Sequence, residues 1–242
     1  MLLESVFETL RRIENERLQL PIFYESPIAL RFETGDPSLD IFLDKAHLNP
    51  KYLRSAFWRV SFLYEKIAPF DTLLWVLYRT PDLETDVTAI IDRFCTLTHL
   101  PSPAEVYQQE VTTSDEEPMT RIFLLWDMKQ TPPLIAPLLK GILSADFKGF
   151  RELSSAVFFF DTERHLLFHP YDDRGADVVA EKAETIRFLY EDCKNWLLEY
   201  DLQRMQKFSR TKKDPFGSFF ISPPFQLSPS AYSLPFYSRN SH

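Results

Sequence analysis

Glycine is scarce in this sequence, with five residues among 242. They are widely spaced along the chain, at Gly35, Gly141, Gly149, Gly175 and Gly217. A phosphate-binding loop or a dinucleotide-binding turn needs several glycines within a few residues, because the backbone must approach the phosphates closely. The sequence therefore excludes nucleotide binding by either of these two devices.

Cysteine and histidine are also rare. The two cysteines, Cys95 and Cys193, each lie in an apolar helical pattern, without a CxxC motif or a histidine-rich neighbourhood. We predict two buried free thiols rather than a disulfide or a reactive pair. The sequence also has no GxSxG elbow for a serine nucleophile, so we predict no catalytic residue, no metal ligand and no cofactor.

The chain has no excess of positive charge. It carries 27 Lys and Arg against 35 Asp and Glu, for a formal net charge of -8. Affinity for nucleic acid depends on cationic side chains that neutralise phosphates. The charge balance thus argues against nucleic acid and favours a neutral or basic protein as the partner.

Long apolar runs are missing as well. The longest, at residues 72–78 and 122–126, fall far short of the ~20 residues that span a bilayer. The first residues, MLLESVFETLRRIENERL, mix charges at helical spacing instead of placing an apolar block after a basic start, so they do not read as a signal peptide. We therefore expect a cytoplasmic protein without membrane contact.

The sequence does contain enough apolar residues, 45%, and enough aromatic residues, 15%, for a sizeable core. Apolar periodicity predicts helices over residues 3–18, 39–46, 52–67, 85–98 and 134–145, and a long final helix with an apolar stripe from Ile186 to Tyr200. Asn49 and Pro50 supply an N-cap and a first-turn proline for the third helix. Apolar or alternating runs predict strands at 28–33, 72–78, 156–160, 165–169 and 176–180, and a hairpin around the acidic turn at 114–118.

These elements predict one α+β domain over residues 1–208. We expect a mostly antiparallel sheet of six or seven strands, covered by helices, in which the wholly apolar runs 72–78, 122–126 and 156–160 are central. Residues 209–242 change abruptly to Ser, Pro and aromatic residues without periodicity. They predict a flexible or loosely docked tail.

The stretch HPYDDRGADVVAE, residues 169–181, is the densest polar cluster. We interpret it as a turn between two strands, in which Asp172 accepts backbone N–H groups and Gly175 takes a left-handed conformation. Arg174 is then free to pair with Asp173, with Asp177 or with a partner. The turn can also be an exposed recognition surface, and the predicted binding residues are Tyr171, Asp172, Asp173, Arg174 and Asp177.

Two alternatives remain for the same stretch. In a regular strand, His165 and His169 point to one face, so they could form a metal site with Asp172, Asp173 and Asp177 and serve a metal-dependent hydrolase. A purely structural alternative joins the turn to the final helix, through Arg174 and either Glu199 or Asp201.

Three stretches, ALRFETG, HPYDDRGADVVA and LYEDCKNWLLEYD, resemble the bacterial family known as domain of unknown function 3885. The resemblance covers about residues 25 to 205. It implies an α+β domain of bacterial origin and brings no catalytic assignment. The matching residues are Arg31, Glu33, Tyr171, Asp172, Asp173, Arg174, Gly175, Asp177, Val178, Tyr190, Trp196, Tyr200 and Asp201.

The sequence thus predicts a non-enzymatic, cytoplasmic protein-binding module. Small acidic α+β proteins often act as immunity partners of secreted toxins, and this analogy suggests a toxin as the partner.

Overall fold

The computed structural model describes residues 1–45, 47–79, 86–112, 118–147, 151–153 and 156–208. The predicted tail over residues 209–242 and the tip of the predicted hairpin, residues 113–117, lie outside the described residues. The domain boundary at residue 208 therefore stays a prediction.

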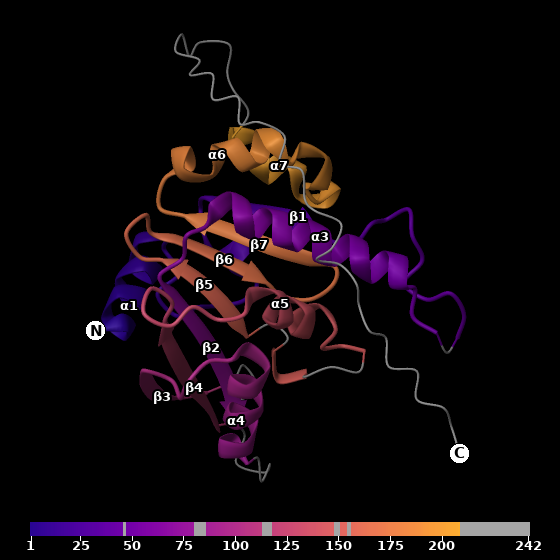
Figure 1. Ribbon diagram of the computed structural model, residues 1–242. Coiled ribbons are helices and arrows are strands. Elements are labelled where there is room, and N and C mark those ends of the chain that lie inside the picture. The colour runs from indigo at the N-terminus through magenta and orange to yellow at the C-terminus, as the bar shows by residue number, and fades with distance from the viewer. Residues whose placement is uncertain (46, 80–85, 113–117, 148–150, 154–155, 209–242) are drawn as a thin grey trace, which may run out of the picture. The chain divides into compact units, whose positions relative to one another are not determined.

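A seven-stranded antiparallel sheet organises the described part of the chain, in the order β1-β7-β6-β5-β2-β4-β3 (Figure 1). The predicted α+β class and the predicted antiparallel sheet are both confirmed. The strands are β1 (Ala29–Glu33), β2 (Thr72–Arg79), β3 (Glu105–Thr112), β4 (Pro118–Asp127), β5 (Val157–Asp161), β6 (Leu166–Pro170) and β7 (Gly175–Ala180).

Helices cover both faces of the sheet. On one face, Phe7 of α1 contacts Phe123 edge-on; on the other, Tyr64 of α3 packs on Phe159 and Phe94 of α4 stacks on Trp75. In Figure 1, α3 and α5 lie in front of the sheet. The helices are α1 (Leu2–Arg12), α2 (Ile22–Glu25), α3 (Pro50–Ile67), α4 (Val87–Thr98), α5 (Ile135–Leu143), α6 (Ala183–Asp192) and α7 (Leu202–Met205).

The three wholly apolar runs form interior strands, as predicted. β5 is the middle strand of the seven, and β2 and β4 follow it in the sheet. All five residues of β5 are buried, and the first four are apolar because helices cover both faces of the sheet. The predicted start of α3 is confirmed too, since the Asn49 side chain accepts a hydrogen bond from the N–H of Lys51 and Pro50 is the first helical residue.

Two predicted helical segments differ in the structure. The first helix ends at Arg12 instead of residue 18, because the Asn15 side chain bonds both the N–H and the carbonyl of Gln19 and closes a loop. Residues 39–45 form no helix, and residue 46 lies outside the described residues. Phe42 and Leu43 are exposed there, so no core contact stabilises a short helix.

The prediction of one long final helix was wrong. α6 ends at Asp192, and the chain then extends at Leu197 and Leu198 to pair with β1: Leu197 bridges Phe32, and the N–H of Leu198 donates to the carbonyl of Arg31 at 3.0 Å. Pairing with a strand edge outweighs the local helical pattern. Tyr200, predicted to lie on the apolar stripe, is 88% exposed.

Both cysteines are free thiols, as predicted. Cys193 is buried, and burial raises its pKa to about 12, whereas Cys95 is half-buried. None of the helices in the described part of the chain has the length and apolarity that a bilayer span requires.

Candidate functional site

A row of three polar side chains crosses neighbouring strands at one end of the sheet. Arg31 on β1 lies opposite Asp177 on β7, which lies opposite His169 on β6. Register partners in an antiparallel sheet point to the same face, so the three side chains share the face that α2 covers. We call Arg31, Asp177 and His169 the polar row.

Arg31 and Asp177 form a buried ion pair. The guanidinium donates from Nε to Oδ1 at 2.7 Å and from Nη2 to Oδ2 at 2.8 Å, the bidentate geometry that favours arginine over lysine. Asp177 is fully buried and Arg31 is 8% exposed. Each charge therefore depends on the other, because neither is hydrated.

The pKa values of the pair reflect burial and mutual attraction. Burial acts against the charge of Arg31, but the hydrogen bonds and charge of Asp177 outweigh it and raise the pKa of Arg31. Burial raises the pKa of Asp177, and the bonds from Arg31 act in the opposite direction. Since arginine keeps its proton in proteins, we treat the pair as ionic.

Aromatic rings and a second carboxylate complete the surroundings of Arg31. Its guanidinium carbon lies 4.9 Å from the ring centre of Phe23 and 4.8 Å from that of Tyr24, both on α2. The Tyr24 hydroxyl donates to Asp201 at 3.0 Å, and Nη1 of Arg31 lies 4.0 Å from the Asp201 carboxylate. Arg31 thus links β1, β7, α2 and the segment at residue 201. The structural alternative assigned the link with Asp201 to Arg174, and that assignment was wrong.

His169 has a fixed tautomer. Its Nδ1 lies 2.9 Å from the carbonyl oxygen of Val157, and since a carbonyl only accepts, Nδ1 carries the proton. The ring stacks on Phe158 with 4.3 Å between centres. Burial lowers the pKa of His169 to about 4, and the charge of Arg31 acts in the same direction. The imidazole is therefore neutral at pH 7, with its lone pair on Nε2.

A pocket of about 190 Å³ opens over the polar row. All three residues of the row line it, together with the half-buried Tyr171 and with Leu20 and Pro21 from the loop before α2. Apolar side chains form most of the wall, and the polar groups are concentrated at the row. We call this space the row pocket.

The predicted turn is present beside the row. Asp172 accepts the backbone N–H of Arg174 at 2.8 Å, as predicted, and it also accepts from Nε and Nη2 of the same guanidinium. This bonding raises the pKa of Arg174. The predicted pairing of Arg174 with Asp173 or Asp177 was wrong, because Asp172 takes that place and Asp146 lies 3.9 Å away.

Asp173 fastens the turn to the rest of the domain. The Tyr52 hydroxyl of α3 donates to its carboxylate at 2.7 Å, and the Thr34 hydroxyl donates to its backbone carbonyl at 2.9 Å. Burial raises the pKa of Asp173, while the bond from Tyr52 acts against that rise. The turn is thus held by α3 and by the end of β1.

Gly175 serves a different purpose from the predicted one. It does not have a positive φ. Instead, a Cβ atom at this position would lie 1.9 Å from the hydroxyl oxygen of Tyr171 and 3.0 Å from the backbone carbonyl of Phe32. Glycine is needed here because the Tyr171 ring lies directly against the backbone.

The prediction of an outward-facing cluster was largely wrong. Asp172, Asp173 and Asp177 are buried, Tyr171 is half-buried, and Arg174 is exposed. The hydrogen bonds described above account for this, because Arg31 of β1, Tyr52 of α3 and Arg174 of the turn itself satisfy the three carboxylates and allow their burial.

The structure also separates the residues of the alternative metal site. His165 lies in the turn before β6 with a φ of 47°, and its Nδ1 is 3.3 Å from the hydroxyl of Thr9, while His169 belongs to the polar row. Within the described ranges, no group of three or more His, Cys, Asp or Glu could hold a metal ion. His165, His169, Asp172, Asp173 and Asp177 therefore do not converge on one ion.

Comparison with known proteins identifies the family. The family model described as "Domain of unknown function (DUF3885)" matches residues 6–201. The chain belongs to this family. The matched range includes the whole sheet, the polar row and Asp201, so the resemblance stated from the sequence is confirmed.

One curated relative of this DUF3885 chain is the "Uncharacterized protein YnaE" of Bacillus subtilis (strain 168). It is 32% identical over 100 residues, which cover 39% of this chain and 46% of the relative. The chain thus matches about half the length of that bacterial protein. No solved structure matches the chain.

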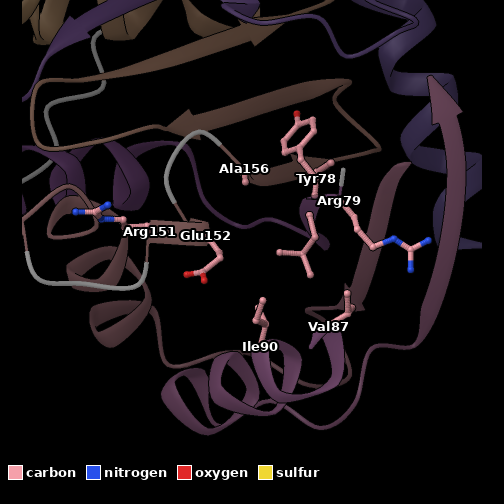
Figure 2. Close-up of a pocket in the computed structure, with 9 residues that line it drawn as sticks. Tyr78, Arg79, Val87, Ile90, Arg151, Glu152 and Ala156 are labelled. Atoms are coloured by element: carbon pink, nitrogen blue, oxygen red, sulfur yellow. The ribbon is translucent and has the colours of Figure 1, made fainter. Parts of the chain in front are cut away.

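A second pocket of this DUF3885 domain, also of about 190 Å³, lies between β2 and α4. Figure 2 shows Val87 and Ile90 projecting from α4 toward it, with the charged groups of Arg79 and Arg151 at its sides. Three charged residues, Arg79, Arg151 and Glu152, line it, but among the described residues no ion pair joins them. The row pocket therefore offers the more specific chemistry.

Sequence reasoning missed Tyr24, Tyr52 and the alignment of His169 with the ion pair. One signal was available: Arg31 and Asp177 each lie between apolar residues within a strand, and a buried charge requires a partner. Asp177 lies within the predicted strand 176–180, but the prediction grouped it with the polar residues of the turn as a possible partner of Arg174, which concealed its pairing with Arg31.

Proposed function

We propose that this DUF3885 domain is a non-enzymatic protein-binding module and that it binds its partner along the free edge of β3. A single observation carries the proposal. β3 is the last strand of the sheet, and within the described residues it pairs with β4 alone. A strand edge with free N–H and C=O groups is a template for a strand from another chain.

The opposite edge of the sheet supports this assignment by contrast. β1 is also a terminal strand, but Leu197 and Leu198 pair with its outer side. The fold therefore covers one edge with its own chain. It leaves eight residues of β3 without such a cover in the described part of the chain.

The side chains of β3 carry little of the usual protection against strand addition. Proteins commonly protect edges with lysine, proline or a charge that points outward. β3 has no lysine or proline, Glu105 accepts the N–H groups of Leu2 and Leu3, and Glu110 accepts from the Thr120 hydroxyl. Val106 is 55% exposed. The edge is thus open and partly apolar.

The chemistry of the partner follows from charge. Two glutamates on β3 and the net charge of -8 favour an extended segment that is neutral or basic. We further propose, by analogy with small acidic immunity proteins, that this partner is a toxin. Among the turn residues, exposed Arg174 is a secondary candidate contact, and the three buried aspartates support the fold.

The experiment has two stages. The full chain is first used to capture partners from its own host at low salt, and a captured protein is then purified with it for hydrogen exchange. We expect slower exchange of the β3 amides in the complex than in the free chain, because added strand pairing protects them. Capture of no partner would contradict the binding function, and protection at residues 171–175 without protection of β3 would contradict the edge.

A pair of matched variants tests the β3 edge as the binding surface. Val106→Lys with Gln108→Lys adds positive charge to the exposed side of β3. This double variant should weaken the binding of a basic partner at least about tenfold. Leu134→Lys, at an exposed site outside β3, serves as the control and should bind like the wild type.

The hydrolase alternative has no comparable support. It requires His165 and His169 to act together with the aspartates of the turn, and the structure assigns these side chains to separate contacts.

A further inference from the structure

We propose that the row pocket binds a small neutral ring that carries one hydrogen-bond donor, that is, a phenol. The proposal concerns the opposite end of the sheet from β3 and does not depend on the edge as a binding surface. Three features of the pocket support it: an unused acceptor, charges that are already paired, and an apolar space of the right size.

The unused acceptor is Nε2 of His169. Nδ1 donates to Val157, which leaves the lone pair on Nε2, and this atom accepts no hydrogen bond from any residue that the structure describes. The side chain is 2% exposed and lines the row pocket. His169 lines the open space of the pocket, so a ligand or a water molecule can donate to this acceptor there.

The charges in the pocket select against an ion. Both oxygens of Asp177 already accept from Arg31, and the remaining side of the guanidinium faces Asp201. A charged ligand would lose its hydration without gaining a counter-ion. A neutral O–H group, by contrast, needs only the lone pair of Nε2.

Size and wall chemistry favour one ring. The volume of about 190 Å³ is somewhat larger than the ~150 Å³ of an apolar cavity that binds benzene. Leu20, Pro21 and the Tyr171 ring offer apolar surface on which an aromatic ring can pack. A single six-membered ring with one hydroxyl fits these limits.

His169 acts here as an acceptor and not as a catalytic base. A base is most effective when its pKa is near the working pH, and burial lowers the pKa of His169 to about 4. The neutral ring therefore keeps its lone pair available throughout the neutral range without taking up a proton. This property suits binding.

The test is an NMR titration of the full chain, with phenol as the ligand and toluene as the ring of similar shape that lacks a donor. We expect phenol to shift the Nε2 resonance of His169 with a Kd on the order of 1 mM, and toluene to bind at least about tenfold more weakly. Equal affinities, or no saturable shift of His169, would overturn the proposal and leave water as the occupant.

Two variants test the location. His169→Phe keeps an aromatic ring but removes the acceptor, so the preference for phenol over toluene should vanish. If that variant does not fold, Leu20→Trp fills the pocket from its exposed wall and should abolish the binding of both rings. Leu134→Trp, at an exposed site far along the chain, should bind like the wild type. Phenol binding that survives Leu20→Trp would contradict the location.

The same titration can distinguish between two sources of the ring. A phenol can come from a free small molecule or from a tyrosine side chain of another protein. N-acetyl-tyrosinamide should match phenol in affinity if the pocket accepts a tyrosine from a protein, and it should fail to bind if the pocket accepts only free phenols.

Discussion

One row of side chains crosses the sheet and has two different halves. On β1, β7 and β6 it consists of Arg31, Asp177 and His169, and on β5, β2 and β4 it continues through Phe158, Leu74 and Leu125. Both halves are buried on the same face. The first half is held by directional bonds between specific partners, and the second by close packing of apolar volume.

The two halves therefore differ in which substitutions they tolerate. An apolar core tolerates substitutions that keep its volume, whereas a buried charge tolerates only changes that keep its partner. β1 is short and pairs with β7 across 146 residues of sequence. A one-residue slip would turn Arg31 to the other face, away from Asp177, so the ion pair fixes the register of this strand.

The largest expected effect comes from breaking the ion pair. Asp177→Leu leaves Arg31 buried without its bidentate partner and should lower the free energy of unfolding by about 3–5 kcal/mol, as measured by urea unfolding. Adding Arg31→Met should recover most of this loss, because an apolar pair of similar volume replaces the charges. Additive losses in the double variant would show that the two side chains are not coupled.

The apolar half provides the control. Leu74→Ala should cost about 2–5 kcal/mol through the cavity it leaves. Arg31→Met should not reduce that cost, because Leu74 lies in the packed half and does not contact the ion pair. Arg31→Met should therefore restore stability when combined with Asp177→Leu, and its effect should simply add to that of Leu74→Ala. This contrast would confirm that the two halves are stabilised differently.

Much of the fold could be predicted from the sequence because local patterns record burial. The apolar runs at 72–78 and 156–160 indicate strands covered on both faces, and the structure has them in the interior. The extended segment at Leu197 and Leu198 could not be predicted, since it depends on β1, far away in the sequence. Its local pattern is helical.

The candidate site could be predicted only in part. The sequence correctly identified a turn at residues 171–175, because aspartate and glycine form such turns locally. The predicted exposure of the aspartates was wrong, since the burial of Asp173 depends on Tyr52 and that of Asp177 on Arg31, both from other elements. A charge in a turn is normally hydrated, and only tertiary partners change this.

The next largest effect is the dependence of folding stability on pH. His169 has a pKa of about 4 in the folded state against a usual 6.5, so its folded pKa is depressed. Its contribution to stability is complete above pH 6.5 and is lost as the pH falls toward 4, by up to about 3 kcal/mol. Urea unfolding of the wild type and of His169→Gln at pH 7, 6, 5 and 4 measures this.

The two halves should again differ in this experiment. The stability of His169→Gln should fall less steeply below pH 6.5 than that of the wild type, because the variant has no imidazole to protonate. Leu74→Ala should lower stability by a similar amount at every pH. Identical slopes for the wild type and His169→Gln would mean that His169 accepts a proton as easily folded as unfolded.

The smallest expected effect on stability comes from alanine substitutions at two glycines. Gly175→Ala should cost about 1–3 kcal/mol, because the new methyl group would collide with the Tyr171 ring and approach the carbonyl of Phe32. Among the described residues, the methyl group of Gly141→Ala on α5 meets side-chain methyl groups of Leu97 and Leu153, at 3.1 and 2.9 Å, and these can move. Alanine also favours the helix by about 1 kcal/mol, so this variant should be nearly neutral.

A double variant shows whether Tyr171 causes the strain at Gly175. If the ring against the backbone is the obstacle, Tyr171→Ala should cost less in the Gly175→Ala background than in the wild type, because it relieves the collision. Chemical denaturation of the four proteins gives this difference. Equal costs in both backgrounds would place the strain on the carbonyl of Phe32, and the polar end of the sheet would then depend on its backbone more than on the ring that borders the row pocket.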